Sequence, residues 1–235
     1  MSSAYFISDL HLDADRPALT ATFAHFLRTI TDCDSLYILG DLFETWIGDD
    51  DDSALASEVA QHLCAFRDSG AQLFLMRGNR DFLLGETYSE RCGAVLLDDP
   101  TVIDLYGRPA LLMHGDTLCT ADTDYQAFRR TVRDPAWQAR TLSLPLEERR
   151  SLARQLRRES LDATRDKAQD IMDVTVSEVD TAMSAHQVDL LIHGHTHRPA
   201  QHETSLGKRW VLGDWGESAW VLQAGENSMD LIDII

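Results

Sequence analysis

The stretch AYFISDLH, residues 4–11, joins a short apolar run to two polar side chains that commonly bind metals, Asp9 and His11. The apolar part contains aromatic and β-branched residues, which predicts a buried strand that ends at the polar pair. SLYILGD, residues 35–41, repeats this arrangement with an apolar run that leads directly to Asp41. A predicted strand followed at once by a possible metal ligand is therefore a recurring unit of this chain.

Helical patterns separate the predicted strands in the N-terminal part. Residues 17–31 carry leucine and phenylalanine at helical spacing, which predicts an amphipathic helix between the first two strands. An acidic run at 49–52 leads into a second helix, which Asp52 or Ser53 is expected to cap. Residues 71–77 (AQLFLMR) predict a third buried strand. This alternation predicts parallel strands joined by crossover helices, and therefore an α/β fold.

The C-terminal part has a different pattern. TVIDLYGRPALLM predicts a hairpin that turns near Tyr106 and Gly107, and the stretches RWVLGDW, AWVLQA and MDLIDI predict a meander of strands. Between the two parts, residues 124–185 contain strong helix formers and few breakers, which predicts a helical insertion. Because this insertion begins and ends near candidate metal ligands, we expect it to form a lid within a single domain that spans residues 1–235.

Seven candidate metal ligands occur in five short motifs that follow apolar runs: SDLH, LGDL, RGNRD, MHGD and HGHTH. Carboxylate, imidazole and amide-oxygen ligands together suit divalent ions such as Mn²⁺, Fe²⁺ or Zn²⁺. Seven ligands are too many for one such ion and suit two, and adjacent ion pairs are typical of enzymes that hydrolyse phosphate esters or anhydrides. The candidate ligands are Asp9, His11, Asp41, Asn79, His114, His195 and His197.

The composition limits the partners and the compartment. A formal net charge of −18 argues against nucleic-acid binding. Residues 123–170 nevertheless carry 11 basic and 8 acidic side chains, a net charge of +3, which predicts either a local anionic partner or a solvated helical face. The four cysteines form no CxxC pair, no apolar stretch is long enough to span a bilayer, and no signal peptide is evident. We therefore expect reduced thiols and a cytoplasmic protein.

The order D-x-H, G-D, G-N, H-G-D and G-H-T-H resembles the calcineurin-like metallophosphoesterase family. The resemblance implies a four-layer α/β/β/α sandwich around two metal ions. It also implies that a metal-bound hydroxide attacks phosphorus in line with the leaving group. On the family's pattern one metal would be held by Asp9, His11 and His197, and the other by Asn79, His114 and His195, with Asp41 between them.

One position departs from the G-N-H-D pattern that is common in that family. This chain has Arg80 in place of histidine, between Asn79 and Asp81. Arginine keeps its charge and cannot serve as a general acid, but its planar fork can bind a phosphate. A phosphate leaving group needs no proton donor, because its second pKa is only about 6. Arg80 therefore favours a pyrophosphate substrate, unless the guanidinium is simply paired with a carboxylate such as Asp81.

Longer stretches, among them YILGDLFETWIGDD, RGNRDFLLG and IHGHTHRP, resemble members of the family that hydrolyse UDP-2,3-diacylglucosamine in lipid A biosynthesis. The resemblance implies attack at the α-phosphorus, Mn²⁺ as the usual metal, and a monomer that docks peripherally on the cytoplasmic face of the inner membrane. The implied catalytic residues are Asp41, Asn79, Arg80 and His195. The implied substrate contacts are Asn79, Arg80, Asp122, Ser160, Thr164, Lys167 and His195.

Spacing within the insertion supports part of that set. Ser160, Thr164 and Lys167 are spaced so that one helix face would present two hydroxyls and a cation to a phosphosugar or uridine. The aromatic side chains that we expect either in an acyl pocket or in the core are Trp46, Tyr125 and Phe128. Two other functions stay open: a metallophosphoesterase that acts on a soluble nucleotide pyrophosphate, and a non-catalytic scaffold on the same fold. The presence of every candidate ligand favours an enzyme.

Overall fold

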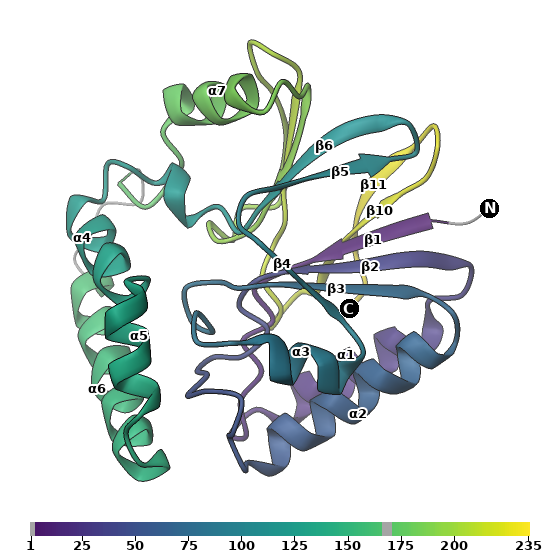
Figure 1. The fold of residues 1–235 in the computed structure, drawn as a ribbon. Coiled ribbons are helices and arrows are strands. Elements are labelled where there is room, and N and C mark those ends of the chain that lie inside the picture. Colours follow the sequence, from purple (N-terminus) through teal and green to yellow (C-terminus); the bar gives the residue numbers. More distant parts are fainter. Residues whose placement is uncertain (1–2, 166–170) are drawn as a thin grey trace.

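The computed structural model describes residues 3–165 and 171–235, and its strands form two stacked sheets (Figure 1). The first sheet has the strand order β11-β10-β1-β2-β3-β4 and the second has the order β5-β6-β7-β9-β8. The strands of the first sheet are β1 (Ser3–Ile7), β2 (Cys33–Leu39), β3 (Gln72–Met76), β4 (Val95–Leu97), β10 (Trp220–Ala224) and β11 (Met229–Asp233). Those of the second sheet are β5 (Thr101–Leu105), β6 (Arg108–Met113), β7 (Leu190–His193), β8 (Ala200–Glu203) and β9 (Lys208–Val211).

The parallel arrangement predicted for the N-terminal strands is confirmed. Strand β1 pairs in parallel with β2, and β2 pairs in parallel with β3, with Ile38 opposite both Ile7 and Leu75. The crossover helices are α1 (Pro17–Thr29), α2 (Ala54–Asp68) and α3 (Glu86–Cys92). Parallel strands end at the same edge of a sheet, so the loops after β1, β2 and β3 are brought together there.

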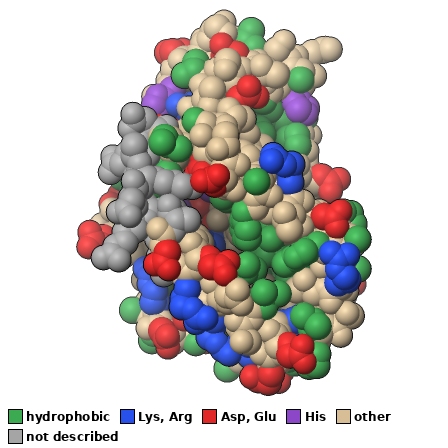
Figure 2. Space-filling model, turned by 90° about the vertical axis from the view of Figure 1, so that its left-hand side faces the viewer, with side chains coloured by type: hydrophobic (Ala, Val, Ile, Leu, Met, Phe, Trp, Pro, Cys, Tyr) green, Lys and Arg blue, Asp and Glu red, His purple; other side chains and the backbone are tan. Residues whose placement is uncertain are grey.

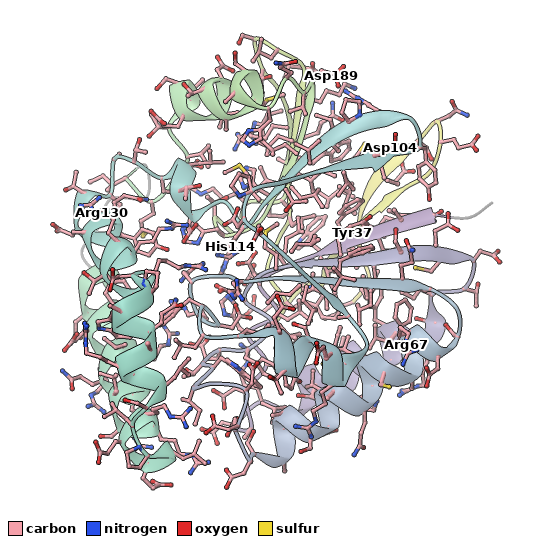
Figure 3. The ribbon with its side chains drawn as sticks, viewed as in Figure 1. Tyr37, Arg67, Asp104, His114, Arg130 and Asp189 are labelled. Carbon is pink, nitrogen blue, oxygen red and sulfur yellow. The ribbon has the colours of Figure 1, made fainter. Side chains whose placement is uncertain are left out.

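Three apolar layers hold the sandwich together. Between the sheets, Tyr37 stacks on both Phe6 and Phe74, with ring centroids 4.8 and 4.6 Å apart (Figure 3). Helices α1, α2 and α3 cover the outer face of the first sheet, while α7 (Val176–Ala185) covers the second sheet through Val179 and Met183. The structure is therefore the expected four-layer α/β/β/α sandwich.

The stretch 124–185 supplies helices to two places. The short helix η1 (Asp116–Leu118) precedes it, and α4 (Thr123–Val132), α5 (Pro135–Leu142) and α6 (Leu146–Arg165) lie together at one side of the sandwich (Figure 1). Helix α7 belongs to the outer layer of the second sheet. The helices that stand beside the strand ends are thus α4, α5 and α6.

Helix α6 is held by a buried cation against the loop between β2 and α2. The guanidinium of Arg149 donates to the carbonyl of Ile47 at 2.6 Å and to the carboxylate of Asp50. The side chain of Arg149 is only 4% exposed, so the guanidinium is shielded from solvent, whereas the carboxylate of Asp50 is exposed. The acidic run at 49–52, which the sequence shows only as a lead into α2, therefore also docks the insertion.

The predicted C-terminal meander is wrong in one respect. Strand β9 lies in the second sheet, between β7 and β8, whereas β10 and β11 form an antiparallel hairpin in the first sheet. The chain crosses from one sheet to the other between β9 and β10. Alternation of apolar residues reports that a strand is buried, but it does not report which sheet it joins, and both sheets here present similar apolar faces.

Candidate metal centre

The candidate ligands lie in loops at the carboxyl ends of strands from both sheets. Strands β1, β2 and β3 lead into the loops of the first sheet, and β6 and β7 lead into those of the second. Because the sheets are stacked with these edges adjacent, ligands that are far apart in the sequence meet at one place. His114 marks this place in Figure 3, where the second sheet faces the ends of β2 and β3. The structure brings together Asp9, His11, Asp41, Asn79, His114, His195 and His197.

One half of the cluster is built around Asn79. The amide oxygen of Asn79 lies 2.8 Å from His114 Nε2 and 2.8 Å from His195 Nδ1. His114 Nδ1 donates to the carbonyl of Leu39 at 2.9 Å, and this leaves Nε2 directed at the cluster. A hydrogen bond from the other ring nitrogen to a carbonyl sets the tautomer that a metal-binding imidazole needs. Asp41 Oδ2 stands 3.9 Å from His114 Nε2.

The other half of the cluster is built around Asp9. His197 Nε2 lies 3.3 Å from Asp9 Oδ1 and 3.3 Å from His11 Nε2. Asp41 Oδ2 also stands 3.9 Å from His11 Nε2, so one carboxylate oxygen is equally distant from both halves. This is the place that a ligand shared by two ions would occupy.

The chemistry of these donors fits a pair of divalent cations. Asp9, Asp41 and His114 are buried, and the contact of Asp9 Oδ1 with His197 lacks good hydrogen-bond geometry, so this buried oxygen has capacity for a cation. Burial lowers the pKa of His114, but the nearby carboxylates of Asp41, Asp116 and Asp9 outweigh it and raise this pKa to about 9. The same negative field attracts metal cations, and carboxylate, imidazole and amide oxygens are ligands that Mn²⁺, Fe²⁺ and Zn²⁺ accept.

Backbone strain is concentrated at the same residues. A positive φ is uncommon for any residue but glycine and costs free energy that the surrounding structure must supply. Of eight such residues in the described part of the chain, five are candidate ligands. Strain gathered in this way is a feature of functional sites. The five ligands with positive φ are Asp9, His11, Asp41, His195 and His197.

Two glycines allow the ligand loops to approach each other. A Cβ atom on Gly78 would lie 2.1 Å from Asp41 Oδ1, and one on Gly194 would lie 2.4 Å from Asp9 Oδ2. Neither contact is possible for a larger residue without moving a ligand. The glycines of the RGNRD and HGHTH motifs are therefore explained by packing between loops.

The buried carboxylate of Asp81 joins two of the ligand loops. It accepts hydrogen bonds from the backbone N–H of Gly78 at 2.7 Å and from that of Leu42 at 2.8 Å. Burial and the neighbouring Asp41 raise the pKa of Asp81 to about 6. Both oxygens of Asp81 accept hydrogen bonds from these backbone amides, so Asp81 is not the partner of the Arg80 guanidinium.

Arg80 directs its side chain toward the insertion. Its backbone N–H donates to Asp41 Oδ1 at 2.7 Å, and its Nη1 donates to Ser160 Oγ at 3.3 Å. Arg80 Nε is buried and has no hydrogen-bond partner among the described residues. A desolvated donor beside the metal ligands is placed to receive an anion.

The other expected substrate contacts are placed as follows. Ser160 lies on α6 and lines the same cavity as Arg80, and Asp122 lines it too while its side chain accepts from the N–H of Tyr125 at 3.0 Å. Asp122 is thus the N-cap of α4. Thr164 falls within α6, but its side chain and all of Lys167 lie outside the described residues.

An apolar cavity opens beside Asn79 and Arg80, between the sandwich and the helices α4, α5 and α6. Figure 2 shows hydrophobic side chains gathered on this face of the molecule, with lysine or arginine side chains along its lower edge. Trp46 is 3% exposed and stacks on Phe43, so it serves the core as well as the cavity wall. The main apolar lining residues are Trp46, Phe82, Phe128, Trp137, Leu152 and Leu156.

Two carboxylates that support the ligands were missed by the sequence analysis. Glu44 Oε2 lies 3.1 Å from His11 Nδ1, and Glu44 also pairs with Arg157 of α6. Asp116, two residues after His114, is fully buried and accepts from Arg129 Nε at 2.8 Å. The spacing H-G-D could have marked Asp116, whereas Glu44 sits in a loop without a repeating pattern.

The four-layer sandwich, with carboxylates, imidazoles and an amide converging at its strand ends, defines a metallophosphoesterase. The chain belongs to the calcineurin-like phosphoesterase family, whose model matches residues 3–199. Members of this family use divalent metals, and the clustered side chains are candidates to hold them.

Relatives with assigned names match almost the whole chain. A protein of Cellvibrio japonicus named UDP-2,3-diacylglucosamine hydrolase is 54% identical over 96% of this chain and 96% of its own. A protein of Pseudomonas aeruginosa with the same name is 50% identical, with 96% of each chain covered. Among solved structures, an archaeal phosphodiesterase has a TM-score of 0.51 at 13% identity and covers 99% of both chains, which supports the fold alone.

Proposed function

We propose that the protein is a metal-dependent hydrolase that cleaves the pyrophosphate of UDP-2,3-diacylglucosamine. The products would be UMP and 2,3-diacylglucosamine 1-phosphate, a step of lipid A biosynthesis. The names of relatives at 50–54% identity support this substrate. The observation that carries the proposal is the apolar cavity that opens directly beside Asn79 and Arg80, because it pairs a lipid-binding surface with a phosphate-binding one.

The metal ligands would divide into two sets that share Asp41. Asp9, His11 and His197 would hold one ion, and Asn79, His114 and His195 the other. Two divalent ions, which we propose to be Mn²⁺, would lower the pKa of a water molecule and neutralise charge on the phosphoryl oxygens.

Arg80 would bind the pyrophosphate at the mouth of the cavity. The guanidinium has a buried Nε and lies within hydrogen-bond distance of Ser160, so it is oriented, and desolvated at Nε, before any ligand arrives. A planar fork of this kind can donate two parallel hydrogen bonds to one phosphate. Because the leaving group is itself a phosphate, no general acid is required at this position.

Hydrolysis of UDP-2,3-diacylglucosamine with Mn²⁺ in ¹⁸O-water tests the reaction. We expect the label in UMP, as attack at the α-phosphorus requires. Label in the lipid product alone would contradict the direction of attack. Equal rates for acylated and deacylated UDP-glucosamine would contradict the acylated substrate and indicate a soluble nucleotide pyrophosphate instead.

A larger side chain in the cavity should lower activity more for substrates with long acyl chains than for those with short ones. Ala153 lines the cavity from α6, and Ala153→Phe would place a ring in the space that we assign to the acyl chains. We expect kcat/KM for the long-chain substrate to fall roughly tenfold, as overpacking costs about 1–3 kcal/mol, and that for a short-chain analogue to fall less. Ala139→Phe, at an exposed position of α5, is the matched control. An equal loss for both chain lengths would refute this assignment.

We also propose that the insertion docks peripherally on an anionic membrane surface. None of the helices in the described residues is both long and apolar enough to span a membrane. Arg154 and Arg158 are exposed on α6 and line a groove together with Arg150 and Arg157. Basic side chains near an anionic surface contribute about 1 kcal/mol each.

Vesicle sedimentation at low salt tests the docking surface. The double variant Arg154→Glu, Arg158→Glu should bind vesicles of anionic phospholipid at least tenfold more weakly than the unaltered protein, because two favourable charges become repulsive. The control is Arg67→Glu on α2, which should bind like the unaltered protein. Equal binding by the double variant would rule out this face.

A further inference from the structure

We propose that helix α4 and its C-cap residue Arg133 position the ligands of the second metal, Asn79, His114 and His195, through contacts of Tyr125, Arg129 and Arg133. The helix is the first element of the insertion, and its residues Tyr125 and Phe128 also line the cavity. The inference rests on the proposed metal centre but not on the identity of the substrate. It makes α4 a part of the metal site as well as of the lid.

The first contact reaches the loop that carries Asn79. Arg133 Nη2 donates to the carbonyl of Gly78 at 3.0 Å and to that of Arg77 at 3.3 Å. The N–H of the same glycine donates to Asp81 Oδ1 at 2.7 Å. The residue immediately before Asn79 is therefore held at both its N–H and its carbonyl, and Arg133 is the part of this support that comes from the insertion.

The second contact reaches the loop that carries His114. Asp116 Oδ2 accepts from Tyr125 Oη at 2.7 Å and from Arg129 Nε at 2.8 Å. Gln126 Nε2 donates to the backbone carbonyl of Asp116 at 2.8 Å. Asp116 is fully buried, so both its charge and its position depend on these donors from one face of α4.

The third contact reaches His195 directly. The ring of Tyr125 lies beside the imidazole of His195, with centroids 5.6 Å apart and an angle of 32° between the planes. The hydroxyl of the same tyrosine is bound to Asp116, so its ring cannot turn away from the imidazole without breaking that hydrogen bond. One helix thus touches the three chain segments whose side chains form one metal set.

Groups that orient metal ligands from outside affect metal affinity selectively. Loss of such a partner commonly weakens metal binding by about 10- to 100-fold while the ligands themselves remain. If α4 only covered the cavity, its arginines would affect substrate binding or thermal stability and leave the affinity for the second metal unchanged. Metal binding in the absence of substrate separates these two roles.

The test is a Mn²⁺ titration of the unaltered full-length protein and of Arg133→Gln. Calorimetry measures the two affinities, and EPR distinguishes single from paired Mn²⁺ ions. We expect the variant to bind one ion as tightly as the unaltered protein and the other at least tenfold more weakly. Asn79→Ala provides the reference for a weakened second site. Arg130→Gln is the matched control, because Arg130 lies on the same helix but is exposed and points away from His114 (Figure 3).

Two results would overturn the proposal: affinities for both ions equal to those of the unaltered protein, or an equal loss at both sites. If Arg133→Gln does not fold, Tyr125→Phe and Arg129→Lys provide the same test with smaller changes, and the same selective weakening is expected. Because no substrate is present, a wrong assignment of the substrate leaves this result unaffected. Absence of any Mn²⁺ binding by the unaltered protein would instead overturn the metal centre itself.

Discussion

Asp41→Asn is expected to lower kcat for hydrolysis of UDP-2,3-diacylglucosamine by about 10³-fold or more, the largest loss that we predict for a single substitution. Asp41 Oδ2 stands 3.9 Å from both His11 Nε2 and His114 Nε2, so its charge would serve both of the proposed metal sets. An amide of the same shape keeps the packing but removes the negative charge that we place between the two proposed cations. A thousandfold loss corresponds to about 4 kcal/mol of transition-state stabilisation, which is within the range that two metal ions supply.

The measurement combines the rate of UMP release with metal content after gel filtration. Asp41→Asn should retain fewer than two Mn²⁺ ions per chain, and the exposed Asp15→Asn should match the unaltered protein in both respects. Asp41 Oδ1 accepts from the N–H of Arg80 at 2.7 Å, and an asparagine oxygen can keep this bond. A variant that kept full activity with both metals would contradict the role of a shared ligand.

Arg80→Ala is expected to lower kcat/KM by about 10²- to 10³-fold, because removal of one positioned donor at a developing charge commonly costs this much. The arginine is buried at Nε, bonded at Nη1 to Ser160 and lines the cavity, so its donors are positioned for an anion. Arg80→Lys keeps the charge but lacks the planar pair of donors, and it should recover only part of the loss.

The decisive comparison uses two substrates with one set of variants. With the pyrophosphate substrate, Arg80→His should remain impaired, because the fork that binds the phosphate is absent. With an activated phosphodiester such as a nitrophenyl ester, the same variants should lose less, since that substrate lacks the second phosphate of the pyrophosphate. Arg130→Ala is the surface control. A loss below tenfold for Arg80→Ala on the pyrophosphate would show that Arg80 has no substantial role.

The N-terminal half of the fold could be predicted because its signals are local. The apolar runs at 4–8 and 35–39 correspond to β1 and β2, and Ser53 caps α2 by accepting from the N–H of Ala56 at 3.1 Å. The assignment of β9 failed, because the pairing of a strand depends on residues far away in the chain. The position of α7 over the second sheet could not be predicted either. Its helical pattern is local, but the strands against which it packs are far away in the sequence.

The sequence by itself determined which side chains could bind metals and in what order they occur. It also showed that position 80 is arginine where the family pattern has histidine. These are properties of single residues and short motifs. Only the tertiary structure decided that Asp81 accepts from the loop amides, that Glu44 lies beside His11, and that α4 contacts Asp116 in the loop that carries His114. The physical reason is distance along the chain. Asp9 and His197 are 188 positions apart in the numbering and meet at 3.3 Å only because two sheets stack with their strand ends at one edge.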